Sequence, residues 1–172
     1  GAHSGELGLA TMPLVPRVVD LLEVPVLAAG GIADGRGLLA ALALGAEGVT
    51  IGTRLLVTDE CPIHDNVKQA LIDATELDTL PILGSLHNTL RAWKNDAALK
   101  VADLEASQGD MWEILPLVAG TETRRMLKDG QVGAGVIACS QSIGIVREVR
   151  PVADVIGGMV QEAEEIRERL AA

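Results

Sequence analysis

The fold of this chain is decided by one stretch, "VPVLAAGGIADGRGLLAALALGAEGVTIGTRLL", residues 24–56. Its apolar run 24–29 is bounded by glycines, which predicts a short buried strand. Asp34 is a suitable N-cap, and leucines at helical spacing follow it as far as Gly45, which predicts a helix between the two. Residues 48–51 predict a second strand. A strand, a helix and a strand with short connections predict two parallel strands joined by a right-handed crossover.

The surrounding sequence continues the same alternation. Residues 15–22 predict a helix before the first strand, so helices and strands alternate as in an α/β barrel or a doubly wound sheet. The chain has 172 residues, of which 48% are hydrophobic, with two Trp and no Phe or Tyr. The core must therefore be built from Leu, Val, Ile and Ala, as is common where helices cover a parallel sheet. The length suits one domain with a substantial core, and the sequence predicts an α/β fold.

Charge and cysteine usage exclude several classes of function. The net charge is −10 and no basic run is present, which argues against binding to nucleic acid or to an anionic membrane. The longest apolar stretches are well short of the roughly 18 residues that cross a bilayer. Cys61 and Cys139 lack metal-ligand spacing, which predicts no metal site and favours reduced thiols in a cytoplasmic protein. A local nest of backbone N–H groups can still bind a phosphate despite the overall negative charge.

Two glycine-containing loops stand out as a candidate phosphate site. Gly30–Gly31 and Gly52–Thr53 each follow the end of a predicted strand, and the two strands are neighbours. Both loops should therefore open on the same face of the sheet, which in barrels carries the active site. Without side chains, backbone N–H groups can approach a phosphate, and Thr53 can add a hydroxyl donor. The spacing favours a phosphate site, and tight turns without a ligand are the alternative.

Two further glycine patterns do not support a dinucleotide-binding fold. Residues 35–40 and 133–138 both fit G-x-G-x-x-A. A dinucleotide fingerprint needs its first glycine directly after a strand and an acidic residue at the end of the next strand. The first pattern lies at the predicted helix start, and the next strand ends in Gly52–Thr53. The second has no clear strand before it, so neither is interpreted as a Rossmann motif.

Three stretches together resemble the nitronate monooxygenases, formerly called 2-nitropropane dioxygenases. They are "GAHSG" (1–5), "AAGGIADGRGLLAALALGAEGVTIGTRLL" (28–56) and "GDMWEILPLVAGTETRRMLKDGQVGAGVIACSQSIG" (109–144). The family pattern has a G-[GA]-H-x-G loop, then A-A-G-G-I, then a strand ending in G-T-R, and all three occur here in order. The resemblance spans nearly the whole chain. It implies the C-terminal part of an FMN-dependent (β/α)8 TIM barrel, an α/β fold whose first half is missing here.

The resemblance also implies three segments. Residues 1–61 would be strand–helix units of the FMN-binding barrel. Residues 62–130 would be a mostly helical insert, the small substrate or cap domain over the barrel mouth. Residues 131–172 would be a return segment and a C-terminal packing helix, whose apolar stripe is clear in the sequence.

Within the insert, the sequence predicts a helix at 64–74 and a strand at 79–84. Residues 85–95, "SLHNTLRAWKN", predict a capped helix start with a packed Trp93, and pocket lining by His87, Asn88 and Trp93 is the alternative. Asp110 and Thr121 are predicted as N-caps, and Gly120 and Gly130 as helix stops.

The resemblance assigns roles to individual residues. His3 matches the catalytic histidine, which would contact the nitro group or take the α-proton of a neutral nitroalkane. Without the resemblance, a solvated terminal histidine is the simpler interpretation. Ala2 stands where the family commonly has glycine, and its extra methyl could narrow substrate choice. Residues that would line or bind FMN are Gly1, Ala2, Gly30, Gly31, Thr50, Ile51, Gly52 and Thr53. Ser140 to Ser142 would lie near the flavin, with a simple polar turn as the alternative.

The implied activity is the FMN-dependent oxidation of alkyl nitronates by dioxygen to a carbonyl compound and nitrite. The flavin supplies that chemistry, and the protein supplies orientation and electrostatics. One alternative is an FMN- and NAD(P)H-dependent enoyl-thioester (enoyl-ACP) reductase, which shares the histidine and phosphate loops. Another is a non-catalytic barrel remnant that binds a phosphate ligand or a partner chain. The expected partners are small molecules, and unpaired strand edges of a partial barrel are compatible with a homo-oligomer.

Overall fold

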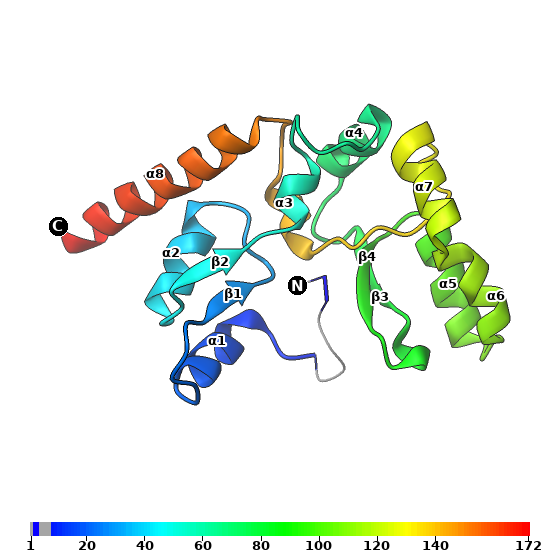
Figure 1. Cartoon of the computed structure of the whole chain (residues 1–172), viewed down its shortest axis with the longest axis horizontal. Coiled ribbons are helices and arrows are strands. Elements are labelled where there is room, and N and C mark those ends of the chain that lie inside the picture. Colours follow the sequence, from blue (N-terminus) through cyan, green and yellow to red (C-terminus); the bar gives the residue numbers. More distant parts are fainter. Residues whose placement is uncertain (1, 4–7) are drawn as a thin grey trace.

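The computed structural model of the chain describes residues 2–3 and 8–172, so the flavin contact predicted for Gly1 lies outside the described residues. The chain is an α/β structure with two groups of elements on either side of a central segment (Figure 1). One group contains α1 (Thr11–Val19), β1 (Leu27–Ala29), α2 (Gly35–Ala43), β2 (Gly48–Thr50) and α8 (Val152–Ala171). The other contains α4 (Asp65–Asp73), β3 (Thr79–Ile82), β4 (Leu90–Trp93), α5 (Asp96–Ala106), α6 (Met111–Val118) and α7 (Gly120–Asp129). Helix α3 (Thr53–Leu56) and the 3₁₀ helix η2 (Gln141–Ile145) lie between them.

The predicted strand–helix–strand unit is present. Strands β1 and β2 pair in parallel, with Leu27 opposite Gly48 and Ala29 opposite Thr50. Helix α2 connects them, and its N-cap is Asp34, whose carboxylate accepts a hydrogen bond from the Gly37 N–H at 3.1 Å. The helix ends at Ala43, and Gly45 follows two residues later. Its φ of 95° is the left-handed conformation that glycine adopts readily at helix ends. Both strands are shorter than the sequence predicted.

Helix α1 begins earlier than the predicted range 15–22. It starts at Thr11, whose hydroxyl donates to the Gly30 carbonyl at 3.0 Å. Pro13 lies in the first turn, where its missing N–H costs no helical hydrogen bond. The helix therefore starts against the loop that follows β1, and this contact ties the first helix to the candidate phosphate loop.

The segment 85–95 was predicted wrongly. It forms a 3₁₀ turn, η1 (Gly84–Leu86), and then strand β4, which pairs antiparallel with β3 so that Ile82 faces Leu90. On the other side of β4, the Trp93 N–H donates to the Ile137 carbonyl at 3.0 Å. Pairing on both sides, with the preceding strand and with the distant residue Ile137, overrides the local helical pattern, as β-propensity depends strongly on context. Trp93 itself packs in the core, as predicted.

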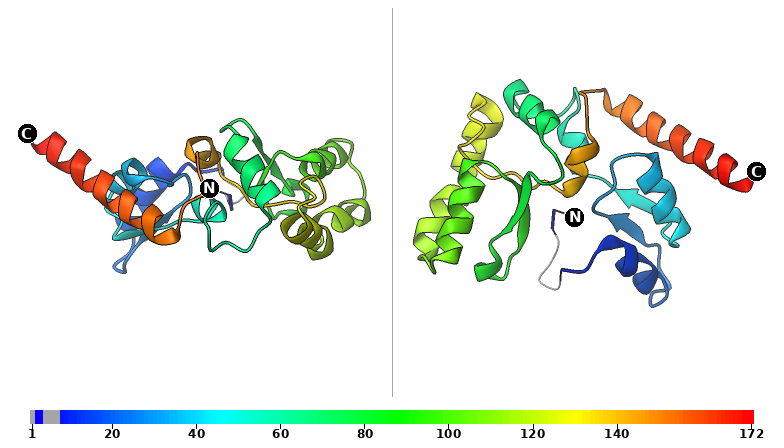
Figure 2. Two further views of the ribbon diagram at one scale, coloured as in Figure 1. Left: turned by 90° about the horizontal axis from the view of Figure 1, so that it is seen from above. Right: turned by 180° about the vertical axis from the view of Figure 1, so that it is seen from behind.

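Two helix-end predictions around α7 were also wrong. The helix begins at Gly120 with Ala119 as its N-cap residue, so Thr121 is not a cap and Gly120 does not end a helix. Asp110, in contrast, forms a complete capping box with Glu113 at the start of α6. In the described residues, the core forms three buried clusters, one of which joins α4, β4 and η2. Figure 2 shows the arrangement of these elements from above and from behind. None of the helices in the described ranges has the length and apolar character needed to span a membrane.

Candidate active site

A cavity of about 360 Å³ lies beside the N-terminal residues Ala2 and His3. Four segments line it: the N-terminus, the loop after β1, the loop after β2 and the return segment near η2. The structure brings together every predicted site residue that it describes, namely Ala2, His3, Gly30, Gly31, Thr50, Ile51, Gly52 and Thr53. The cavity is also lined by Ser140, which the resemblance placed near the flavin, and by four residues that the sequence did not single out, namely Ala29, Ile32, Leu56 and Ala138.

The two glycine loops meet because β1 and β2 are parallel neighbours, so their carboxyl ends lie at one edge of the sheet. Gly30 and Gly31 have φ values of 97° and 78°, which glycine adopts without strain. At Gly31 and Gly52, an added Cβ would meet no other atom within 4 Å. Both glycines therefore border open space, and their backbones can be approached by a ligand.

Thr53 adds a hydroxyl whose orientation is restricted. It is buried, and its Oγ1 accepts a hydrogen bond from the Ser140 N–H at 3.0 Å. A hydroxyl has one hydrogen, so the Thr53 O–H remains available to donate to another group. Behind it, the Ser140 and Ser142 hydroxyls are 2.6 Å apart and both are buried. Of the turn residues 140–142, Ser140 lines the cavity, which makes it a cavity residue as well as part of a polar turn.

His3 lies at the cavity with an exposed side chain. Its neighbour Ala2 is held by a backbone hydrogen bond, in which the Arg91 N–H donates to the Ala2 carbonyl at 2.6 Å. The Arg91 carbonyl accepts from the Cys139 N–H at 3.0 Å. Strand β4 therefore connects the histidine segment with the return segment, and this role of Arg91 left no signal in the sequence because only its backbone is used.

The other two histidines have different environments. His64 caps α4, since its Nδ1 accepts a hydrogen bond from the Asn66 N–H at 3.1 Å. His87 is exposed in the turn before β4 and has a left-handed φ of 51°. Neither is among the residues that line this cavity, so His3 is the histidine placed to act in it.

Cys139 illustrates how burial affects a group beside the site. Its side chain is fully buried, and burial raises the pKa of its thiol from the ordinary 9.0 to about 12. We expect a thiol reagent at pH 8 to modify partly exposed Cys61 in the folded protein and Cys139 only after unfolding. Because the folded state retains this proton, the contribution of Cys139 to stability is complete below about pH 9 and is lost as the pH rises toward 12. Counting the modified thiols with and without denaturant, with Cys61→Ser as the control, checks the labelling prediction. Rapid labelling of the folded Cys61→Ser protein would contradict it.

Known proteins resemble this chain over part of their length. The FabK structure from Thermotoga maritima superposes with a TM-score of 0.88 and 33% identity, covering 95% of this chain and 51% of that one. A Rhodococcus jostii (strain RHA1) protein named (3aS,4S,5R,7aS)-5-hydroxy-7a-methyl-1-oxo-octahydro-1H-indene-4-carboxyl-CoA dehydrogenase is 35% identical, covering 95% of this chain and 56% of the relative. A probable nitronate monooxygenase of Staphylococcus haemolyticus (strain JCSC1435) is 49% identical over 72 residues, 42% of this chain and 20% of that protein.

The chain thus spans about half the length of the Thermotoga and Rhodococcus proteins, and the match to the Staphylococcus protein covers 20% of that protein. The family model described as nitronate monooxygenase matches residues 1–162, nearly the whole sequence. On this match, the chain belongs to the nitronate monooxygenase family.

Proposed function

We propose that the chain is the C-terminal part of a (β/α)8 barrel that oxidises alkyl nitronates with FMN and dioxygen, giving a carbonyl compound and nitrite. The observation that carries the proposal is the convergence of His3 and both glycine loops on one cavity. Family membership and the named relative from Staphylococcus haemolyticus support the same reaction class. The free cysteines fit a reducing compartment such as the cytoplasm.

The residues of the cavity suit FMN. The cavity has a volume of about 360 Å³, which falls within the usual range for small-molecule sites, about 300–1,000 Å³. The backbones at Gly30, Gly31 and Gly52, with the Thr53 hydroxyl, would hold the phosphate. Neutral N–H and O–H donors can do this in a protein of net charge −10, because the binding depends on local dipoles. The apolar side chains of Ile32 and Leu56 would contact the less polar parts of the cofactor.

When bound, FMN would accept electrons from the nitronate and pass them to dioxygen. The chain's own residues would prepare and orient the substrate. The His3 imidazole would take the α-proton of a neutral nitroalkane, or donate a hydrogen bond to the nitro group of a nitronate. The exposure of His3 leaves its ring able to exchange that proton with solvent. The tether between Arg91 and Ala2 would hold the imidazole at the cavity while it does so.

A second candidate function is an FMN- and NAD(P)H-dependent enoyl-thioester reductase. The observation that favours it is the Rhodococcus relative, which is named for a carboxyl-CoA substrate and is 35% identical over most of this chain. Oxygen consumption and nitrite release with an alkyl nitronate would support the first function. Oxidation of NAD(P)H that depends on an enoyl thioester, without nitrite release, would support the second. Absence of saturable FMN binding would contradict both and favour a non-catalytic barrel remnant.

The contact between FMN and the second loop can be tested with one methyl group. Gly52→Ala places a Cβ in open space, and the φ of −119° at this position suits an L-residue. We expect the melting temperature to stay unchanged and FMN affinity to fall about tenfold, because the methyl group occupies space that the phosphate needs. Quenching of FMN fluorescence measures the affinity. Gly120→Ala, also in open space but outside the cavity lining, is the matched control; equal affinities in the two variants would place the phosphate elsewhere.

A further inference from the structure

A second cavity, of about 410 Å³, lies behind the two loops that line the first one. Its walls include the start of α2, helix α3, the segment 145–150 and one face of α8. Thr53 and Arg54 are consecutive, yet Thr53 lines the first cavity and Arg54 lines the second. We call the second one the arginine cavity, because Arg54, Arg147 and Arg150 all line it.

Arg54 is the central observation. It is only 8% exposed, and within residues 2–3 and 8–172 its guanidinium forms a single hydrogen bond, from Nη1 to the Val57 carbonyl at 2.8 Å. A guanidinium carries five N–H donors, so most of them have no protein partner. In the described part of the chain, no fully buried side-chain nitrogen or oxygen lacks a hydrogen-bond partner. The free donors of Arg54 must therefore reach the open space of the cavity.

Arg150 adds a second positive charge nearby. Its backbone is fixed beside α3, because its carbonyl accepts from the Asp59 N–H at 3.2 Å and it bridges Thr58. Burial lowers the pKa of Arg54, the nearby positive charge of Arg150 lowers it further, and the negative charge of Glu148 opposes the shift. An ion pair at 2.6 Å with Glu148 compensates Arg150 in part, and both side chains are about half exposed.

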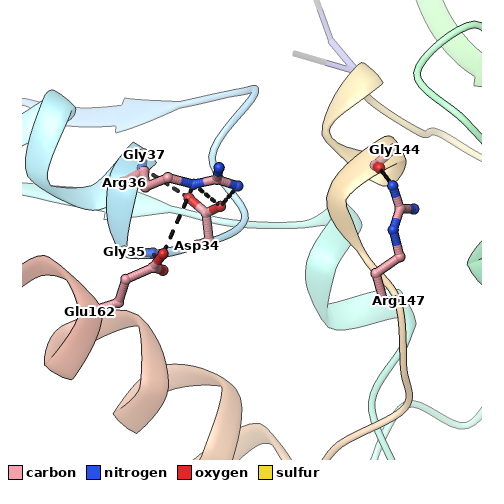
Figure 3. A network of polar contacts seen from close by, with 7 residues as sticks. All are labelled: Asp34, Gly35, Arg36, Gly37, Gly144, Arg147 and Glu162. Atoms are coloured by element: carbon pink, nitrogen blue, oxygen red, sulfur yellow. Dashed lines mark hydrogen bonds and ion pairs between the residues drawn. The ribbon is translucent and has the colours of Figure 1, made fainter.

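The carboxylates of the cavity are mostly engaged elsewhere. Asp34 binds Arg36 and the Gly37 N–H, and Glu162 accepts from the Gly35 N–H at 2.7 Å (Figure 3). Arg147, from the opposite wall, donates to the Gly144 and Val146 carbonyls. Asp154 lies in the first turn of α8, where the helix dipole favours a negative charge. The cavity is thus lined by three arginines and four carboxylates, and three of the carboxylates are already bound: Asp34 and Glu162 at the start of α2, and Glu148 by Arg150.

We propose that the arginine cavity binds the phosphate group of a small molecule, with Arg54 and Arg150 as its main ligands. The planar fork of a guanidinium matches the oxygens of a phosphate, and a shared anion would remove the repulsion between the two arginines. The site is separate from the proposed FMN site, and it requires no flavin. The volume exceeds what a lone phosphate fills, so a phosphate ester is the better fit.

Isothermal titration of the full chain with inorganic phosphate, and separately with glycerol 3-phosphate, tests the proposal. We expect saturable binding to the unaltered chain. Binding to Arg150→Gln should be at least about tenfold weaker, which is the loss expected for one hydrogen bond to a charged group. Arg150 is half exposed, so this variant should fold. Tighter binding of the ester than of inorganic phosphate would identify a phosphorylated small molecule as the ligand, and equal binding would identify free phosphate.

Gly52→Ala is the control, because it alters the first cavity alone. If Arg150→Gln loses more affinity for phosphate than Gly52→Ala does, the result supports the arginine cavity. The proposal is overturned if phosphate does not bind saturably, or if Gly52→Ala loses as much affinity as Arg150→Gln or more. Arg54→Lys keeps the charge and removes the fork, so it should also weaken binding, and the side-chain Nε–H resonance of Arg54 should shift on titration. An unshifted resonance would again contradict the site, whether or not the chain binds FMN.

Discussion

His3→Asn should reduce turnover of a neutral nitroalkane by at least about 100-fold, the lower end of what a general base contributes. His3 is the histidine that lines the cavity formed by the two glycine loops. Asparagine can still donate a hydrogen bond to a nitro group, but it cannot accept the α-proton. The large effect therefore depends on proton transfer, and oxygen consumption with the FMN-loaded protein measures it.

The choice of substrate separates the two roles of His3. A preformed alkyl nitronate has already lost its α-proton, so His3→Asn should slow its oxidation by less than about tenfold, the worth of one modest hydrogen bond. His87→Asn is the matched control, because His87 is exposed and does not line the cavity. Equal losses with both substrates would show that His3 orients the substrate without acting as a base. Full activity with the neutral nitroalkane would remove His3 from the reaction.

The part of the site that could be predicted from sequence is the part built from adjacent strands. Residues 24–56 contain both strands, the helix between them and both glycine loops. Once the strands are taken as parallel neighbours, the loops must meet at one edge of the sheet, and the structure places them there. Local signals such as the Asp34 cap and Gly45 fixed the ends of α2.

Other parts of the site depend on pairings between distant residues. Strand β4 was predicted as a helix start; one of its partners, 79–82, is the preceding strand, but the other, 137–139, is far away in the sequence. The contact between Arg91 and Ala2 uses backbone atoms, so no side-chain pattern could reveal it. Ser140 was recognised as a polar residue among apolar ones, but its bond to Thr53 requires a return of the chain over 87 positions.

The glycine patterns that did not fit a dinucleotide site now have a packing explanation. A Cβ at Gly133 would lie 2.7 Å from Asp96 Oδ2, and one at Gly135 would overlap the backbone at Thr123. A Cβ at Gly35 would lie 2.5 Å from the Met159 carbonyl oxygen and 2.6 Å from the Ala163 nitrogen. These glycines allow close approach between elements, and at Gly35 the elements are α2 and α8.

Gly35→Val should therefore destabilise the chain strongly. The side chain would have to push α8 away from the start of α2, because the atoms it meets are mainly backbone atoms that cannot rotate aside. The separation would also break the hydrogen bond from the Gly35 N–H to Glu162. We expect a loss of about 3 kcal/mol, the upper end for overpacking. For a chain of this size that corresponds to a fall in melting temperature of about 6–12 °C, measurable by thermal denaturation.

Gly157→Ala on α8 should change stability in the opposite direction. A Cβ there meets nothing within 4 Å, and alanine is favoured over glycine in a helix by about 1 kcal/mol, so the melting temperature should rise by about 2–4 °C. The two variants differ in whether the new atoms fall inside the α2–α8 contact, so the comparison isolates that contact from helix propensity. Because α2 follows directly on the Gly30–Gly31 loop, Gly35→Val should also weaken FMN binding, whereas Gly157→Ala should leave it intact. A Gly35→Val protein as stable as the unaltered chain would mean that α8 does not pack on α2 in solution.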